Sequence, residues 1–80
     1  MFYVYILSSG KDNKQYTGMT NNLNRRLEEH SLGFVKSTRN RRPLVLVYYE
    51  EFETKSDALK QEKFFKSGQG REYLKVKLKK

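Results

Sequence analysis

The beginning of the chain alternates in the way expected of β-strands. Residues 2–7, FYVYIL, are aromatic and β-branched, which favours a strand. Alternation would place Phe2, Val4 and Ile6 on one face and Tyr5 on the other. Ser, Gly, Asp and Asn crowd residues 8–14 and predict a hairpin loop, which leads into a second strand.

That second strand is expected over residues 15–20, QYTGMT. Gly18 inside it indicates either a bulge or a place where another group approaches the backbone closely. The helix that follows would be capped by Asn21 or Asn22 and would run to about Ser31, ended by Gly33.

Leu23 and Leu27 define the inward stripe of this first helix. At about 100° per residue, Arg26 lies roughly −60° and His30 roughly −20° from Leu23. Both polar side chains therefore border the apolar face of the helix instead of opposing it.

The third strand is expected at residues 44–52, LVLVYYEEF, opened by Pro43. Its almost continuous apolar run is typical of a central strand. Thr54 with Asp57 forms a capping-box pattern that begins a second helix at about 55–67.

These elements predict one α/β (α+β) domain over residues 1–80, with a small, mainly antiparallel three-stranded sheet flanked by helices. The order is β-β-α-β-α with an optional third helix. We expect the core to span about residues 2–68 and residues 69–80 to form a short basic helix or tail. The two helices and the sheet would leave room for only a thin core, since a chain of this size buries about 60% of its unfolded surface.

Composition narrows the class of protein. The chain has no Cys, which excludes disulfides and thiolate metal sites. No run approaches the ~20 apolar residues of a membrane span. The first residues, MFYVYIL, also lack the basic region and cleavage site of a signal peptide. We therefore expect a cytoplasmic protein.

The charge indicates a polyanionic partner. Seventeen Lys and Arg against nine Asp and Glu give a formal net charge of +8. Residues 36–42, KSTRNRR, hold four of these cations and no acid. Such a distribution suits nucleic acid, because each neutralised phosphate releases counterions. Charge that only maintains solubility, or a ribosomal or membrane-surface role, is the alternative.

Glu62 breaks the helical pattern of residues 57–65, DALKQEKFF. With Ala58 at zero, Glu62 lies roughly 40° away and Phe65 roughly −20°, so the carboxylate falls within the apolar stripe. It could form a buried ion pair with Arg26, although desolvation often cancels the attraction of such a pair.

Five polar side chains now point toward a small sheet, and together they suit phosphodiester cleavage. A carboxylate can hold a hard divalent cation, and an arginine can contact phosphate oxygens with two hydrogen bonds. Phenols and an imidazole can relay a proton. Each of these side chains also has an ordinary structural explanation. The five residues are Tyr5, Tyr16, Arg26, His30 and Glu62.

The order of these residues resembles that of the GIY-YIG nuclease family, specifically its small stand-alone bacterial members. YVYIL at residues 3–7 is similar to the GIY strand, and YTG at residues 16–18 is similar to the YIG element, eleven residues after Tyr5. NLNRRLEEH then places Arg26 at the helix arginine of the family, with His30 one turn later. TKSDALKQEKFFK places Glu62 at the family's metal-binding glutamate.

The resemblance implies a nuclease module like those of homing endonucleases and of the excision-repair incision subunit. Glu62 would bind Mg²⁺ or Mn²⁺, and Arg26 would contact the scissile phosphate. Tyr5 and Tyr16 would position or deprotonate the attacking water, and His30 would assist proton transfer. Which of these groups is the general base stays open.

The same resemblance implies DNA as the partner, with RNA as the alternative nucleic acid. No separate DNA-binding domain is recognisable in the sequence. Specificity would then come from a protein partner, from DNA structure such as a flap, nick or single strand, or from the basic residues. The residues expected to contact nucleic acid are Gly18, Lys36, Arg39, Arg41, Arg42, Lys63 and Lys66.

Our expectation from the sequence is therefore a divalent-metal-dependent endonuclease that acts on DNA, directed by structure and not by sequence. A non-catalytic nucleic-acid-binding module that retains the nuclease fold is the alternative. A third hypothesis is an interaction protein whose basic face binds an acidic partner. The inward carboxylate favours the first over the second, since a binding module needs none.

Overall fold

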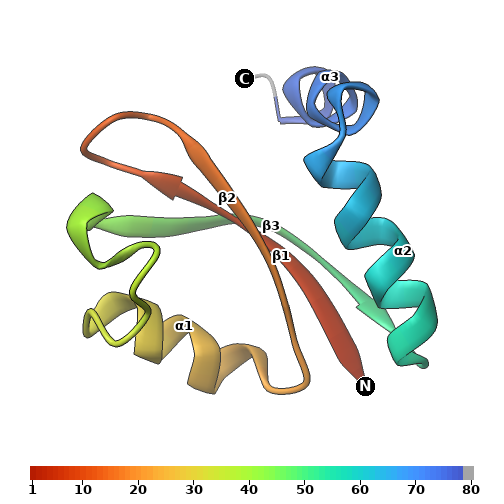
Figure 1. The fold of residues 1–80 in the computed structure, drawn as a ribbon, viewed down its shortest axis with the longest axis horizontal. Coiled ribbons are helices and arrows are strands. Elements are labelled where there is room, and N and C mark those ends of the chain that lie inside the picture. Colours follow the sequence, from red (N-terminus) through yellow and green to blue (C-terminus); the bar gives the residue numbers. More distant parts are fainter. Residues whose placement is uncertain (79–80) are drawn as a thin grey trace.

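The computed structural model describes residues 1–78, and its three strands form one antiparallel sheet. Two helices, α2 and α3, cover one face of the sheet and α1 covers the other (Figure 1). The elements, in chain order, are β1 (Phe2–Ser9), β2 (Gln15–Thr20), α1 (Leu23–Ser31), a 3₁₀ turn (Arg39–Arg41), β3 (Leu44–Phe52), α2 (Lys55–Lys66) and α3 (Gly68–Lys77). The expected fold class is confirmed, and the optional third helix is present.

The helix caps confirm the sequence signals. The Asn22 side chain accepts a hydrogen bond from the backbone N–H of Arg25, and Thr54 accepts one from that of Asp57. Each bond satisfies one of the free N–H groups of a helix N-terminus. Gly33, after α1, has a φ of +82°, a left-handed conformation that suits glycine.

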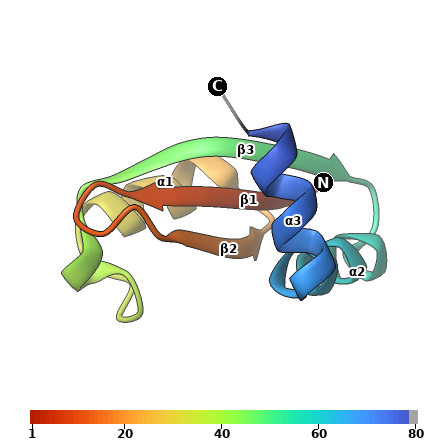
Figure 2. The ribbon, with the colours of Figure 1, turned by 90° about the horizontal axis from the view of Figure 1, so that it is seen from above.

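The central strand is β1, between β2 and β3 (Figure 2). Our expectation that residues 44–52 form a central strand is therefore wrong. The pairing of β1 with β3 shifts by one residue between Ile6 and Leu7, because Val47 bulges out of β3.

The bulge changes the face of the sheet toward which the half-buried residues of β3 point. Before it, Leu44 and Leu46 line a cleft with Leu27 of α1. After it, Tyr48 and Phe52 pack against the core beneath α2. The positions between these residues are apolar as well, but Val45, Val47 and Tyr49 are 57%, 38% and 47% exposed. The apolar run is therefore almost continuous although the strand lies at an edge and alternates between half-buried and exposed residues.

The hydrophobic core lies between β1 and the helices α2 and α3. Val4, Ile6, Ala58, Phe65 and Leu74 are each at most 1% exposed and pack together. Because Leu74 belongs to α3, the core extends past residue 68, where we expected it to end. The last two residues of the predicted tail, 79 and 80, lie outside the described residues.

No helix within residues 1–78 is long and apolar enough to cross a membrane.

The angle between α2 and α3 depends on a close backbone contact at Gly70. The Ser67 side chain, between the two helices, accepts a hydrogen bond from the N–H of Gly70 at 3.1 Å. A Cβ atom on Gly70 would overlap with the carbonyl group of Phe64 in the last turn of α2. Only glycine fits there, and its fit holds Leu74 in the core.

We predict that Gly70→Ala lowers the free energy of unfolding by about 1–3 kcal/mol, the typical cost of forcing extra atoms into a packed site. Gly68→Ala is the matched control, because within residues 1–78 its added Cβ would have no atom within 4 Å apart from its chain neighbours and the backbone of its own helix. There the loss of unfolded-state freedom should leave stability unchanged or raise it by up to about 1 kcal/mol. Urea unfolding of both variants measures the difference, and equal stabilities would contradict the packing argument.

Candidate active site

Tyr5 occupies the middle of the central strand on the face covered by α1, and it is 1% exposed. Its partner across the ladder is Gly18 of β2. A Cβ atom on Gly18 would overlap with Cζ and the hydroxyl oxygen of Tyr5. The phenol therefore lies across the backbone of β2 and brings its hydroxyl group toward the outer strand. Of the two alternatives that the sequence left open at Gly18, a bulge or a close approach, the structure has the close approach, and this phenol makes it.

His30, in the last turn of α1, is held by two buried hydrogen bonds. Its Nε2 lies 2.9 Å from the Tyr5 hydroxyl and its Nδ1 lies 2.7 Å from Oγ1 of Thr38. His30 is 1% exposed and Thr38 is fully buried. A neutral imidazole has one donor and one acceptor nitrogen, and each hydroxyl can do either, so the chain Tyr5–His30–Thr38 satisfies both ring nitrogens.

The pKa shifts keep this chain uncharged at neutral pH. Burial, reinforced by the positive charge of Arg26, lowers the pKa of His30. Burial also raises the pKa of Tyr5, and this outweighs the opposing interaction with Arg26. The imidazole is therefore neutral and the phenol protonated, which is the state in which a proton can pass between them.

Arg26 places a guanidinium group at the open end of this chain. Its interaction with the Tyr5 hydroxyl is the main cause that raises its pKa. Its Nη1 also lies 3.1 Å from a carboxylate oxygen of Glu29, and the side chain is 36% exposed. Arg26 lines an open cleft of about 340 Å³ at the start of α1, where an anion can reach it.

Tyr16, at the start of β2, lies with its ring next to the rings of His30 and Tyr5. Its ring centroid lies 5.2 Å from that of His30 and 6.4 Å from that of Tyr5. Unlike Tyr5, it is only half-buried, and it lines a cleft that opens on the α3 side of the sheet. Four of the five predicted residues therefore meet around the Tyr5 hydroxyl.

Glu62 approaches from the opposite face of the sheet, on α2. Its side chain is 19% exposed, and its carboxylate lies 3.3 Å from Nζ of Lys66. Its negative charge contributes to raising the pKa of Tyr5, although it is the smallest of the named causes. The buried ion pair with Arg26 that the sequence allowed does not form, because Arg26 pairs with Glu29.

This set of donors suits a divalent metal that is held by one carboxylate together with water and substrate phosphates. No group of three or more His, Cys, Asp or Glu side chains that could enclose a metal is found within residues 1–78. Mg²⁺ is commonly held by one or two carboxylates together with water and substrate phosphates. Glu62 is partly exposed and suits that arrangement as the single protein carboxylate.

Thr38 is the residue of this site that the sequence did not reveal. It lies in the loop between α1 and β3, inside the basic segment 36–42, where neither strand nor helix periodicity applies. Its short polar side chain in a charged loop gave no signal of burial. Only the tertiary contact with His30 identifies it.

Two of the loop arginines expected to bind nucleic acid are engaged in contacts within the fold. Nε of Arg41 lies 3.5 Å from the carboxylate of Asp12 in the β1–β2 hairpin. Arg42 donates hydrogen bonds to the carbonyl oxygens of Arg39 and Ser31 at 2.9 and 3.4 Å.

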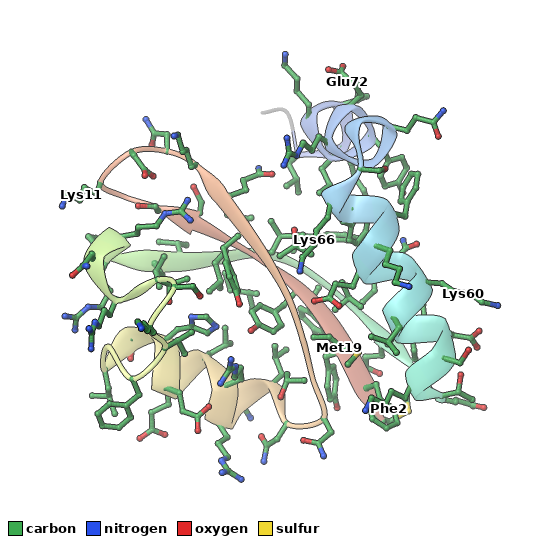
Figure 3. The ribbon with its side chains drawn as sticks, in the orientation of Figure 1. Phe2, Lys11, Met19, Lys60, Lys66 and Glu72 are labelled. Carbon is green, nitrogen blue, oxygen red and sulfur yellow. The ribbon has the colours of Figure 1, made fainter. Side chains whose placement is uncertain are left out.

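The other expected contacts differ in exposure. Lys36, Arg39 and Lys63 are exposed, whereas Gly18 is buried beneath Tyr5. Lys66 extends from α2 beside the sheet and pairs with Glu62 (Figure 3). Their role in binding nucleic acid stays a prediction.

Comparison with known proteins identifies the family. The model of the GIY-YIG catalytic domain matches residues 1–75. The chain therefore belongs to the GIY-YIG family, a nuclease superfamily whose members generally depend on divalent metal ions.

Relatives of similar size share this family. The chain is 44% identical to UPF0213 protein SH2523 of Staphylococcus haemolyticus over 75 residues, which cover 92% of this chain and 90% of that protein. It is 49% identical to UPF0213 protein CPE1444 of Clostridium perfringens over 67 residues, covering 82% and 71%. The solution NMR structure of UPF0213 protein BH0048 from Bacillus halodurans superposes with a TM-score of 0.60 at 41% identity, covering 99% of this chain and 86% of that one. These names assign no activity.

The lowered pKa of His30 predicts a pH dependence of stability. The unfolded chain takes up a proton near the ordinary pKa of about 6.5, whereas the folded chain takes it up only at lower pH. His30 therefore contributes stability above pH 6.5, and this contribution decreases as the pH falls from there toward the folded-state pKa.

Urea unfolding from pH 8 to pH 5 measures this effect against His30→Gln, which has no titrating group. The difference in unfolding free energy between wild type and variant should shrink as the pH falls. A difference that is constant across this range would contradict the shift. Because His30 is the only histidine of the chain, NMR of its ring reports the same pKa directly.

Proposed function

We propose that the protein is a divalent-metal-dependent endonuclease that hydrolyses phosphodiester bonds in DNA. The observation that carries this proposal is the buried chain Tyr5–His30–Thr38, which ends beside the guanidinium of Arg26. A neutral proton-relay chain next to a partly exposed cation supplies two things that phosphodiester hydrolysis needs, which are proton transfer and stabilisation of negative charge.

Each residue has a role that follows from its place. Arg26 faces an open cleft and would bind the oxygens of the scissile phosphate, for which its planar group is suited. Tyr16, the half-buried phenol, would orient the attacking water. Tyr5 and His30 would accept and pass on its proton, and Thr38 would hold the imidazole in place.

Glu62 would hold the metal. A bound Mg²⁺ or Mn²⁺ would neutralise charge that develops on the phosphate and would acidify a coordinated water.

We infer that DNA structure and not base sequence selects the substrate. The cationic groups around the site are Lys and Arg side chains in open clefts. Contacts of such groups to phosphates position a nucleic acid but carry no sequence information. A flap, nick or single strand, which exposes one backbone to these clefts, is therefore the expected substrate class.

A non-catalytic nucleic-acid-binding module is the second candidate, and the ion pair between Glu62 and Lys66 favours it. That pair gives the inward carboxylate a structural partner without any metal. The two candidates differ in whether cleavage occurs. An assay with Mg²⁺ or Mn²⁺ on plasmid, single-stranded, flapped and RNA substrates separates them.

We predict that Glu62→Gln lowers metal-dependent cleavage by at least about 100-fold, because several kcal/mol of metal stabilisation are lost. DNA binding measured without divalent metal should be retained. Glu53→Gln, which removes the same charge from an exposed loop residue, is the control and should cleave like wild type. Unchanged cleavage by Glu62→Gln would remove the metal assignment.

Arg26→Ala should lower cleavage by about 10²–10³-fold, the usual cost of removing one group that stabilises developing charge. Arg26→Lys, which keeps the charge without the planar fork, should be intermediate. Thermal melting should show little loss of stability, since the half-exposed pair with Glu29 contributes about 1 kcal/mol or less. An Arg26→Ala variant that is unfolded would instead indicate a structural salt bridge.

A further inference from the structure

Two adjoining clefts lead away from Tyr16 between the start of β2 and the helix α3. The outer cleft, of about 550 Å³, is lined by Lys14, Gln15, Arg71 and Lys75. The inner cleft, of about 300 Å³, shares Gln15 and Arg71 with it and reaches Tyr16. Because they share walls, they form one continuous channel, here called the β2–α3 groove, which ends at the candidate active site.

The walls of this groove carry positive charge only. Among the described residues, 1–78, its cations are Lys14, Lys66, Arg71 and Lys75, and no Asp or Glu lines either cleft. Within residues 1–78, Lys66 is the one member of this set that forms an ion pair, with Glu62. The remaining three are exposed, and none of them forms an ion pair within the same range.

The cations of α3 are held in place by the fold. Arg71 and Lys75 are four residues apart, so they lie on the same side of the helix. Leu74 between them is buried in the core, and the Ser67 cap fixes the first turn. Lys14 faces them from the end of the β1–β2 hairpin, so the groove has cations on both walls.

We propose that the β2–α3 groove binds the sugar-phosphate backbone of the substrate strand on one side of the bond that is cut. Lys14, Arg71 and Lys75 each contact a phosphate. This rests on the proposed function, since the partner is the DNA of that reaction. A phosphate backbone fits better than an acidic peptide because the groove opens at Tyr16, beside the groups that would act on a phosphodiester.

The loop segment 36–42 is less suited to this role than the groove. Arg41 and Arg42 make contacts within the fold, as described above, whereas the three groove cations have no carboxylate partner among residues 1–78. Phosphate binding at Arg71 and Lys75 would therefore break no ion pair of the described part of the chain. The groove places these cations along the path by which a strand would reach Tyr16.

The test compares two triple variants that remove the same charge. One carries Lys14→Gln, Arg71→Gln and Lys75→Gln. The control carries three Lys→Gln changes at exposed residues that line none of the clefts described here: Lys11, Lys55 and Lys60. Figure 3 shows Lys11 at the tip of the hairpin and Lys60 on the outer side of α2.

Fluorescence anisotropy without divalent metal measures the affinity for single-stranded and flapped oligonucleotides over a series of salt concentrations. Each lost phosphate contact reduces the slope of log K against log salt by about 1. The groove triple should reduce the slope by about 2–3, and the control triple by less than about 1. In cleavage assays the groove triple should raise KM at least tenfold and change kcat by no more than about threefold.

Equal changes in both triples would overturn the inference, since only net charge would then matter. If wild type shows no salt-dependent DNA binding, the proposed substrate itself fails. If wild type binds and cleaves DNA while the groove triple keeps the full slope, the groove assignment alone fails. The single variants Arg71→Gln and Lys75→Gln, each expected to reduce the slope by about 1, give the same comparison should the triple variant fold poorly.

Discussion

The hydrogen bond between the Tyr5 hydroxyl and Nε2 of His30 joins the central strand to α1, and the site is built around it. Its continuation from Nδ1 to Thr38 joins the loop before β3 to the same point. Both bonds are buried, so losing any partner would leave a desolvated polar group, which costs about 1–3 kcal/mol. In a domain of 80 residues with one small core on the other face of the sheet, this is a large fraction of the total stability. The same two hydrogen bonds therefore fix the geometry of the candidate active site and hold α1 against the sheet.

Gly18 explains how the Tyr5 hydroxyl comes to lie at the outer strand of the sheet. Alternation puts Tyr5 on the α1 face and Glu62 reaches the sheet from α2, on the other. A side chain at residue 18 would block the phenol, whereas glycine lets the ring cross the outer strand. The Tyr5 hydroxyl then lies where the charge of Glu62 still influences its pKa.

The sequence was sufficient for the parts of this protein that depend on local periodicity. Helical rotation places Arg26 and His30 at the border of the apolar stripe, and it identifies Glu62 as a carboxylate turned inward. It could not reveal Thr38, whose burial depends on a contact eight residues away in an aperiodic loop. It also misplaced β3, because the exposed residues Val45, Val47 and Tyr49 are apolar and give an edge strand the continuous apolar run of a strand buried on both sides. Both failures concern features that depend on tertiary structure and that no periodicity of the sequence encodes.

The distribution of ion pairs leaves the excess positive charge concentrated on one side of the sheet. The four ion pairs found within residues 1–78 involve α1, α2, the loop before β3 and Asp12 of the β1–β2 hairpin, and none includes a residue of α3. Within the same residues, Lys14 at the end of the hairpin and the α3 cations Arg71 and Lys75 are therefore left without carboxylate partners, on one side of β2. Charge that served only solubility would not need to gather there, since the like charges repel one another across the groove. A polyanion removes that repulsion, and the path it would follow ends at Tyr16. The edge strand β2 thus lies between the candidate active site and the proposed β2–α3 groove, and Tyr16 borders both.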